Sequence, residues 1–374
     1  MARQSWYINE SELDDFQIQI MQRQMDNSFI VKGCAGSGKT VLALWRAKEI
    51  DEAGLGSYYV IVYTKALRQF IDDGVKDIGL SERNVVHHWQ WKYKLGMPHA
   101  DYIIIDEVQD FTSDELRELQ AAADKAFFLF GDSAQQIYKG LKHGLMTMEE
   151  IAVLTRISME TLFKNHRLPK KIARVAEKIS TTYDPLELRC LKEGMAKPYL
   201  IEARNFNAQL DFIKQVIDEK EYSDVGILFQ DNHQVKQADE YYKKADFKVE
   251  AKYDISFPDD TKFNLNFHSE NPKMMTYHSA KGLQFEAVFL PNCNVTDSGE
   301  DAVNPLYVAL TRTYQDLYVL HSGDLSDFLS QLPSELFEGR HEISSSRNTS
   351  NIKTKKQTEL DVQIDEIEAD DLPF

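Results

Sequence analysis

Residues 33–40 have the composition and spacing of a phosphate-binding loop. They read Gly-Cys-Ala-Gly-Ser-Gly-Lys-Thr, which fits the pattern G-x-x-x-x-G-K-[ST], between an apolar run at residues 29–31 and a helix-like run at residues 41–45. In such a loop the backbone N–H groups and the positive end of the following helix attract phosphate. The residues expected to contact a nucleotide here are Gly33, Gly36, Ser37, Gly38, Lys39 and Thr40.

The last two residues of this loop have separate expected roles. Lys39 is expected to reach the β- and γ-phosphates and to act in catalysis, whereas the Thr40 hydroxyl is expected to ligate Mg²⁺. A flexible glycine loop is the alternative interpretation. The strand-like run before the loop and the helix-like run after it favour a nucleoside triphosphate site.

A second apolar run, at residues 102–105, ends abruptly in carboxylates at Asp106, Glu107 and Asp110. A continuous apolar strand is buried on both faces, which indicates a parallel sheet. At the end of this strand Asp106 can bind Mg²⁺ through water, and Glu107 can orient or deprotonate an attacking water. A solvated turn is the alternative, but it does not require a second carboxylate.

Polar residues also follow two further strand-like runs. Residues 58–63 lead into Thr64 and Lys65, and residues 126–130 lead into Gly131-Asp132 and Gln135. Ligands bind at the carboxyl ends of the strands in open α/β sheets, so these side chains are expected along one edge. Four strands with helices between them predict one doubly wound domain over residues 1–150.

The rest of the chain predicts a second α/β domain over residues 151–340. Strand-like runs alternate with helical patterns, and residues 252–272 are polar and read as a loop. The expected strands include residues 199–201, 225–229, 274–276, 288–290 and 317–320, and the expected helices are 169–180, 206–219, 232–245 and 302–313.

Composition limits the remaining alternatives. A chain of 374 residues suits two domains, and its net charge of −17 requires any nucleic-acid groove to be a local basic feature. Its three cysteines match no metal-ligand or disulfide spacing. No apolar run approaches the roughly twenty residues of a membrane span. With no secretory signal at the start, we expect a cytoplasmic protein without a membrane partner.

Aromatic and basic residues interleave at residues 85–94, which include His88 and Trp89. Such a stretch can stack on bases while it contacts phosphates. A helix with core tryptophans and solvated lysines explains the same pattern, and both interpretations remain open.

In order along the chain, these stretches resemble the motifs of superfamily 1 helicases of the UvrD/Rep type, from Leu13 to Leu320. The resemblance implies two RecA-like domains with ATP in the cleft between them. It also implies that Gln17 reads the adenine edge, that Gln135 senses the γ-phosphate, and that Arg167 and Arg312 touch it. His166 belongs to the same implied nucleotide site, as do Gly282 and Gln284 in the stretch 276–285, which in the family grips the DNA backbone and the ribose.

The expected contacts with single-stranded DNA lie in both halves of the chain, and the family motifs supply Thr64, Lys65, Tyr138, Thr276, His278 and Ser279. The aromatic and basic stretch adds His88 and Trp89 as candidates under the first of its two interpretations. The chain also departs from the family. His166 and Val41 stand where a tyrosine and an arginine usually sandwich the adenine, and Gln284 stands in place of a glutamate. The gap between Trp91 and Tyr102 has no room for the family's usual insertion.

The resemblance therefore implies a DNA-dependent ATPase and helicase that moves 3′ to 5′ on single-stranded DNA, with ATP and Mg²⁺ as cofactors. Replication, repair, defence and mobile elements are all compatible settings. The alternative is a nucleotide-gated regulatory or adaptor subunit that recruits DNA-processing partners without unwinding DNA.

Residues 341–374 read as a flexible, disordered acidic tail. Its end resembles the tip of bacterial single-stranded-DNA-binding proteins, which docks on replication and repair enzymes. The aromatic ring and terminal carboxylate can fill an apolar pocket with a basic rim. A solvated acidic tail and self-inhibition are the alternatives. The residues expected to bind partners are Asp370, Asp371, Leu372, Pro373 and Phe374.

Overall fold

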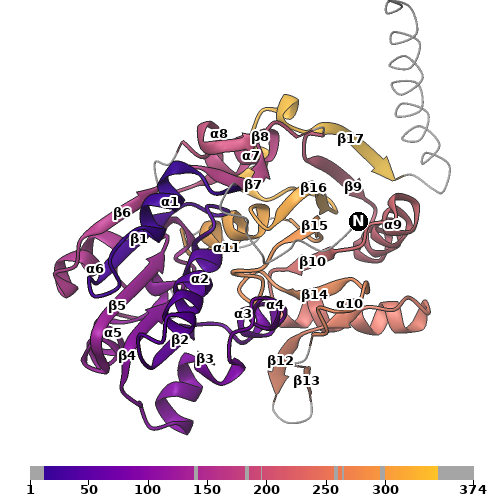
Figure 1. The fold of residues 1–374 in the computed structure, drawn as a ribbon. Coiled ribbons are helices and arrows are strands. Elements are labelled where there is room, and N and C mark those ends of the chain that lie inside the picture. The colour runs from indigo at the N-terminus through magenta and orange to yellow at the C-terminus, as the bar shows by residue number, and fades with distance from the viewer. Residues whose placement is uncertain are drawn as a thin grey trace, which may run out of the picture.

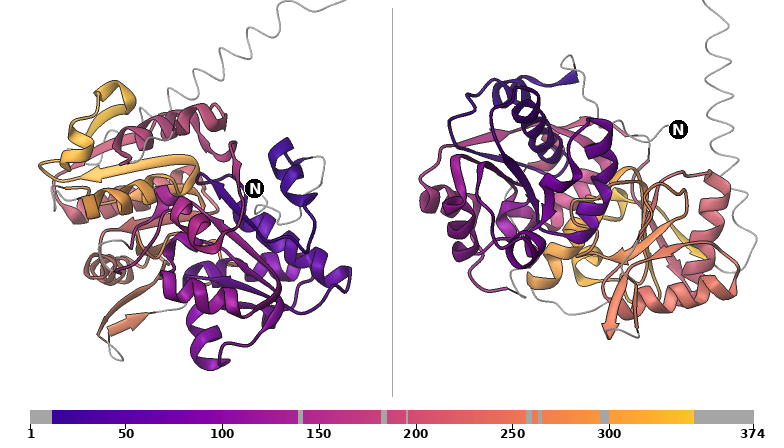
Figure 2. Two further views of the ribbon diagram at one scale, coloured as in Figure 1. Left: turned by 90° about the vertical axis from the view of Figure 1, so that its left-hand side faces the viewer. Right: turned by 60° about the horizontal axis from the view of Figure 1, so that its bottom comes forward.

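The computed structural model describes residues 12–138, 142–181, 185–194, 196–256, 260–262, 265–294 and 300–343. These residues form two parallel sheets with helices packed against them, and the two halves of the chain appear as two adjoining lobes (Figures 1 and 2). The α/β class with parallel sheets, expected from the apolar runs, is confirmed. Within the described residues, no helix has the length and apolar character needed to cross a membrane.

The first sheet has six strands in the order β3-β2-β4-β5-β1-β6. Its central strands are almost wholly apolar and buried on both faces, because helices cover each side. The strands are β1 (Phe29–Gly33), β2 (Tyr58–Val62), β3 (Val85–His87), β4 (Ala100–Ile105), β5 (Ala123–Gly131) and β6 (Met159–Leu162). The helices are α1 (Asp15–Met21), α2 (Lys39–Glu52), α3 (Lys65–Phe70), α4 (Asp72–Asp77), α5 (Ser113–Ala121) and α6 (Met148–Thr155).

Strand β6 pairs with β1 although it lies beyond residue 150, where the first domain was expected to end. Its sequence, Met-Glu-Thr-Leu, has none of the apolar continuity of β1 or β4 because it is an edge strand. The first sheet therefore includes residues from both expected domains.

The second sheet has seven strands in the order β11-β14-β10-β15-β16-β9-β17. The strands are β9 (Tyr199–Ala203), β10 (Val225–Phe229), β11 (Glu250–Ala251), β14 (Lys273–Thr276), β15 (Phe285–Leu290), β16 (Thr313–His321) and β17 (Glu338–Ile343). The helices of this half are α7 (Lys170–Ile179), α8 (Leu186–Arg189), α9 (Phe206–Lys220), α10 (Asn232–Lys244), α11 (Glu300–Leu310) and α12 (Asp327–Ser330). Two small ribbons complete the fold, β7 (Asn165–Pro169) with β8 (Cys190–Lys192) and β12 (Tyr253–Ser256) with β13 (Asp260–Lys262).

Two expectations about irregular segments were wrong. Residues 252–272 contain the antiparallel pair β12–β13, whose short polar strands lack an apolar alternation. Strand β17 pairs in parallel with β9 and includes residues 341–343, which composition had placed in the tail. Both are edge or two-stranded pairings, which need little apolar sequence. The rest of the tail, with Asp370, Asp371, Leu372, Pro373 and Phe374, lies outside the described residues.

An apolar core spans the boundary between the two sheets. Cys34, Ala66 and Ile137 from the first half pack in one cluster with Leu168 and Leu283 from the second. This cluster holds the phosphate-binding loop and the loop after β14 in a fixed relation to each other.

Candidate nucleotide and nucleic-acid site

The glycine-rich loop connects the end of β1 to the start of α2. Gly36 and Gly38 adopt left-handed backbone conformations, with φ of 77° and 89°. The Lys39 ammonium donates hydrogen bonds to the carbonyl oxygens of Gly33 at 2.9 Å and Cys34 at 3.0 Å, so its charge lies inside the loop. This is the position from which a lysine neutralises bound phosphate.

Gly36 is a position where a side chain cannot fit. A Cβ atom built there would lie 2.5 Å from Cβ of Arg167 and 2.7 Å from the amide oxygen of Asn165. We expect Gly36→Ala to lower stability by about 1–2 kcal/mol from backbone strain, with a further loss from the clash. Because the clash displaces Arg167, we also expect the Gly36→Ala variant to hydrolyse ATP more slowly than the wild type.

The matched control is Gly54→Ala, which has a similar left-handed φ of 59° and no atom within 4 Å of its Cβ. Backbone strain should lower the melting temperature of Gly54→Ala, and its ATPase rate should equal that of the wild type. Equal ATPase rates in the two variants would contradict a role for the Gly36–Arg167 contact.

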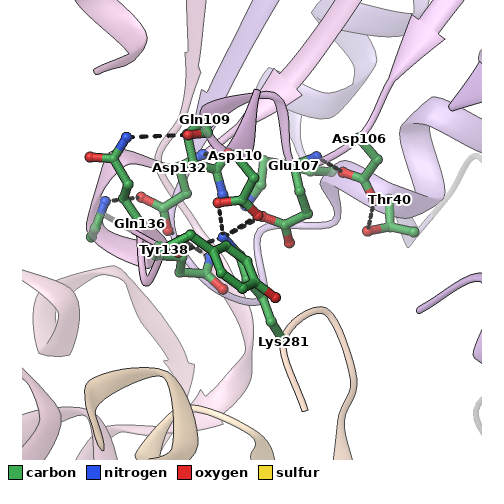
Figure 3. A network of polar contacts seen from close by, with 12 residues as sticks. Thr40, Asp106, Glu107, Gln109, Asp110, Asp132, Gln136, Tyr138 and Lys281 are labelled. Carbon is green, nitrogen blue, oxygen red and sulfur yellow. Dashed lines mark hydrogen bonds and ion pairs between the residues drawn. The ribbon is translucent and has the colours of Figure 1, made fainter. Parts of the chain in front are cut away.

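The carboxylates that follow β4, Asp106 and Glu107, lie beside Thr40 at the end of the phosphate-binding loop (Figure 3). The Thr40 hydroxyl donates to a carboxylate oxygen of Asp106 at 2.6 Å, and the side-chain amide of Gln109 donates to Glu107 at 2.5 Å. Glu107 has a left-handed φ of 59°, which turns the chain sharply after the strand. These contacts bring both carboxylates beside the phosphate-binding loop, as the apolar run predicted.

Electrostatics separates the two carboxylates. Burial, reinforced by the charge of Glu107, raises the pKa of Asp106 to about 7. Burial acts in the same direction on Glu107, but Lys281, Lys39, the hydrogen bond from Gln109 and Arg312 together outweigh it, so the pKa of Glu107 is lowered. Glu107 therefore remains an ionised carboxylate, which is the form that a general base requires.

Thr40 and Asp106 supply hard oxygen donors of the kind that Mg²⁺ binds. Among the described residues there is no group of three or more His, Cys, Asp or Glu side chains that could hold a metal ion without help. This donor set fits a Mg²⁺ ion that takes its remaining ligands from nucleotide phosphates and water.

Lys281 is a site residue that sequence reasoning did not select. It comes from the loop after β14 in the second sheet, and its ammonium donates to both oxygens of Asp110, each at 2.7 Å. It also donates to the carbonyl of Gln135 at 2.5 Å and lies 3.8 Å from Glu107 (Figure 3). Its side chain is fully buried. A fully buried lysine requires an acidic partner, but the sequence does not identify which carboxylate that is.

The two arginines expected at the γ-phosphate, Arg167 and Arg312, each contact a glutamine side chain. Arg312 donates from Nη2 to the side-chain oxygen of Gln135 at 2.7 Å. Arg167 donates from Nε to the side-chain oxygen of Gln284 at 2.8 Å, and its Cβ lies against Gly36. Burial and then the neighbouring positive charge of Arg312 lower the pKa of Arg167 to about 9.

Gln17 and His166 lie at the other end of the loop. The Gln17 amide donates to the carbonyl of Ser37 at 3.1 Å and accepts from the backbone N–H of Asp14 at 3.0 Å. His166 lies 2.8 Å from the Asp14 carboxylate, and its backbone N–H donates to the carbonyl of Gly36 at 2.9 Å. Both side chains thus border the phosphate-binding loop, and Asp14 connects them.

Most of the residues expected to contact a nucleic-acid strand lie on two facing segments. Thr64 caps α3 by accepting from the N–H of Leu67 at 3.1 Å, next to Lys65. On the other side, the Thr276 and Ser279 hydroxyls are 3.2 Å apart. Packing is tight between the segments, because a Cβ on Gly282 would lie 2.9 Å from the Leu67 side chain.

Tyr138 bridges the two halves of the chain. Its hydroxyl donates to the carbonyl of His278 at 3.4 Å, and the two rings are 5.7 Å apart. This contact places both residues next to Lys281, whose ammonium lies 5.7 Å from the Tyr138 ring centre.

His88 and Trp89 are adjacent in sequence but differ in environment. His88 is buried against Phe111, at a ring distance of 4.9 Å, and burial lowers its pKa to about 4. Trp89 is 49% exposed and lies 5.9 Å from the Tyr93 ring, with the Lys94 ammonium 5.6 Å from its own ring. The fully buried Trp91 and the buried His88 fit the core interpretation, whereas the exposed Trp89 fits a stacking surface.

Two segments of the chain match helicase domain families. Residues 29–203 match the core domain of viral superfamily 1 RNA helicases, and residues 274–320 match the UvrD-like helicase C-terminal domain. No curated protein sequence matches the chain significantly.

Three of the solved structures that resemble the chain are described as helicases or a helicase domain. The C-terminal domain of a possible DNA helicase from Lactobacillus plantarum has 20% identity and a TM-score of 0.36, over 46% of this chain and 96% of that domain. The Arterivirus nonstructural protein 10 helicase has 17% identity and a TM-score of 0.43, over 83% of this chain and 62% of its own. The PRRSV helicase has 13% identity and a TM-score of 0.43, over 83% of this chain and 54% of its own.

The chain thus spans 62% and 54% of the lengths of these two viral helicases. The two matched segments include every strand of the first sheet and, in the second sheet, β9, most of β14, β15 and β16. In these two segments the chain is therefore similar to the cores of superfamily 1 helicases.

Proposed function

We propose that this helicase core couples ATP hydrolysis to 3′-to-5′ movement along single-stranded DNA. The observation that supports it best is the convergence of charged groups from two sheets. Lys39 at the start of α2 and Glu107 after β4 lie beside the first sheet, and Arg312, just before β16 of the second sheet, reaches Gln135 at 2.7 Å. A γ-phosphate bound among them would hold the two halves together, and hydrolysis would release that attraction.

In this proposal each group has one role. Lys39, Arg167 and Arg312 stabilise the γ-phosphate, Gln135 senses it, and Glu107 activates the attacking water. Thr40 and Asp106 hold Mg²⁺ while the loop amides hold the phosphates. The nucleoside contacts are assigned to Gln17, His166, Gly282 and Gln284.

The direct test is ATP hydrolysis by the purified chain with and without single-stranded DNA and RNA. We expect strong stimulation by DNA and none in Lys39→Ala. If neither single-stranded DNA nor RNA changes the rate of ATP hydrolysis, the proposal is wrong. Strand-displacement assays with 3′ and 5′ tails then test the direction, and only the 3′-tailed duplex should be opened.

A nucleotide-gated adaptor is the second candidate. It is favoured by the net charge of −17 and by the short connection from Trp91 to Tyr102, which leaves no room for an additional domain. An adaptor would bind ATP and change its affinity for a protein partner without opening DNA. Strand displacement by the isolated chain decides against it.

The chain terminus is proposed to dock on proteins that recognise the tip of single-stranded-DNA-binding proteins. The sequence Asp-Asp-Leu-Pro-Phe ends in an aromatic side chain and a carboxylate, which suit an apolar pocket with a basic rim. We expect deletion of residues 367–374 to abolish binding to such proteins in calorimetry.

A variant with the same eight residues in scrambled order is the control, because it keeps the charge and loses the terminal phenylalanine. If the intact and the scrambled tail bind equally well, the tail acts through its charge and the terminal phenylalanine is not recognised. Faster DNA-stimulated hydrolysis after deletion would instead indicate self-inhibition.

A further inference from the structure

Three exposed apolar side chains lie beside the ribbon β7–β8 and take no part in the site described above. Phe163, just before β7, is 47% exposed, Leu188 in α8 is 85% exposed and Leu191 in β8 is 53% exposed. The pairing of β7 with β8 brings Phe163 next to Arg189, whose guanidinium lies 5.9 Å from the ring centre. Lys192, which follows Leu191, is exposed as well. We call these five residues the ribbon surface.

The stretch that carries the ribbon surface is basic, although the protein as a whole is acidic. Residues 163–194 contain eight Lys and Arg against four Asp and Glu, in a chain with a net charge of −17. Two of these carboxylates already pair with α7, because Arg174 donates to Glu187 at 2.9 Å and Lys170 donates to Glu193. The surroundings of the ribbon therefore attract an anionic partner.

The mixture of side chains indicates which kind of anion fits. Nucleic acid is one candidate, and it binds by phosphate contacts together with stacking of bases on flat side chains. The two leucines offer no ring for stacking, and they gain free energy only when other apolar groups cover them. A peptide that carries both acidic and apolar residues meets the cations and the leucines together.

The chain itself contains a segment of this composition near its end. Residues 361–374 include six acidic residues and no basic residue. Apolar side chains are interspersed among the carboxylates, at Val362, Ile364, Ile367, Leu372 and Phe374. This segment therefore supplies both kinds of side chain that the ribbon surface can bind.

The segment is also within reach of the ribbon surface. Residues 334–336, just before β17, pack against α7, the helix that directly follows β7 (Figure 1). Strand β17 then extends for six residues, or about 20 Å at the rise of a β-strand. The 17 residues between the end of β17 and residue 361 can span up to about 60 Å. Residues 361–374 can therefore return to the ribbon of the same molecule.

We propose that the acidic segment 361–374 docks on the ribbon surface of its own chain. The two cations pair with its carboxylates, and the three apolar side chains pack against its apolar residues. This docking does not depend on movement along DNA, and a docked segment is unavailable to other proteins until one displaces it. The Phe163 ring also lies 5.0 Å from the ring of Phe16 in α1, so the docked segment borders Gln17 and the expected nucleoside side of the site.

The test is photo-crosslinking in the full chain, with benzoylphenylalanine in place of Phe374. After irradiation, mass spectrometry should find the crosslinks in residues 186–192, and the crosslinked product should have the size of a monomer. Arg189→Glu combined with Lys192→Glu should lower the crosslinked fraction at least about fivefold, because two attractive charge pairs become repulsive.

The apolar part of the surface is tested separately. Leu188→Ser combined with Leu191→Ser should also lower the crosslinked fraction about fivefold, since the apolar residues of the segment lose their contacts. The matched controls are Val153→Ser, at a 79% exposed position on α6, and Lys244→Glu, at an exposed position on α10. Both controls should crosslink like the wild type, and all variants should keep the wild-type melting temperature because the changed side chains are at the surface.

Crosslinks outside the ribbon, or wild-type yields in both ribbon variants, would overturn the docking. A crosslinked dimer would show that the segment docks on a second copy instead of its own chain. If charge reversal weakens binding of oligo(dT) and leaves the crosslinks unchanged, the surface binds nucleic acid and the docking is wrong. DNA-stimulated ATP hydrolysis is measured independently of these outcomes, so the proposed function stands or fails separately.

Discussion

Replacing Lys281 with methionine should destabilise the protein by about 3–5 kcal/mol, because it leaves the buried carboxylate of Asp110 without its cation. The pair is fully buried and makes two hydrogen bonds of 2.7 Å across the boundary between the sheets. Urea unfolding of the purified variant measures the loss. The same variant should hydrolyse ATP more slowly, since Lys281 also lowers the pKa of Glu107.

The size of that loss should depend on pH. Burial raises the pKa of Asp110 to about 7 from an unfolded value of 3.8, against the attraction of Lys281. Without Lys281 this pKa rises further, whereas at pH 6 the Asp110 carboxyl is already mostly neutral in both proteins. At pH 8 more of it must be charged in an apolar site, so the variant should be less stable relative to wild type at pH 8 than at pH 6.

The matched control removes both charges. Asp110→Asn with Lys281→Met removes both ions of this pair, so it should recover part of the lost stability and lose the pH dependence that Asp110 contributes. If the single variant unfolds at the same urea concentration as the wild type at pH 8, the ion pair does not hold the two halves together.

Replacing Glu107 with glutamine should reduce ATP hydrolysis by about 10²- to 10⁴-fold, the contribution of a positioned general base. The substitution keeps the size and the acceptor oxygen that Gln109 contacts at 2.5 Å, so the fold should be retained. Single-turnover hydrolysis of ATP measures the effect. Binding of a fluorescent nucleotide should change little, because the loop and Lys39 supply most of the phosphate contacts.

Glu118→Gln is the control for removing a carboxylate from the same half, because Glu118 pairs with Lys92 at 2.5 Å on α5. It should hydrolyse ATP at the wild-type rate. A wild-type rate in Glu107→Gln would show that another group activates the water.

Local patterns in the sequence were sufficient for the parts of the site that lie within one strand and the turn after it. The phosphate-binding loop between β1 and α2 and the carboxylates after β4 were predicted in this way, because the apolar strand and the polar turn are contiguous. The parallel α/β class followed from the same apolar runs, since strands buried on both faces have a distinct composition.

Pairings between distant segments were not predictable in the same way. Lys281 meets Asp110 across 171 positions of sequence, and Lys252 meets Ser279 because β14 lies beside β11 in the sheet. In each pair, the residues around one member give no sign in the sequence of which residue the other member is. The edge strands β6 and β17 and the pair β12–β13 were missed or misplaced for a related reason, since strands with an exposed side need little apolar sequence.

The sequence alone therefore determined the type of chemistry that we propose, because a site for phosphate and Mg²⁺ requires particular residues at fixed spacing along one segment. Tertiary structure alone decided which charges from the second sheet complete that site, and that Trp89 is exposed while the adjacent His88 is buried. The physical reason is that packing between distant segments sets burial and charge pairing, and an isolated stretch of sequence carries no information about what packs against it.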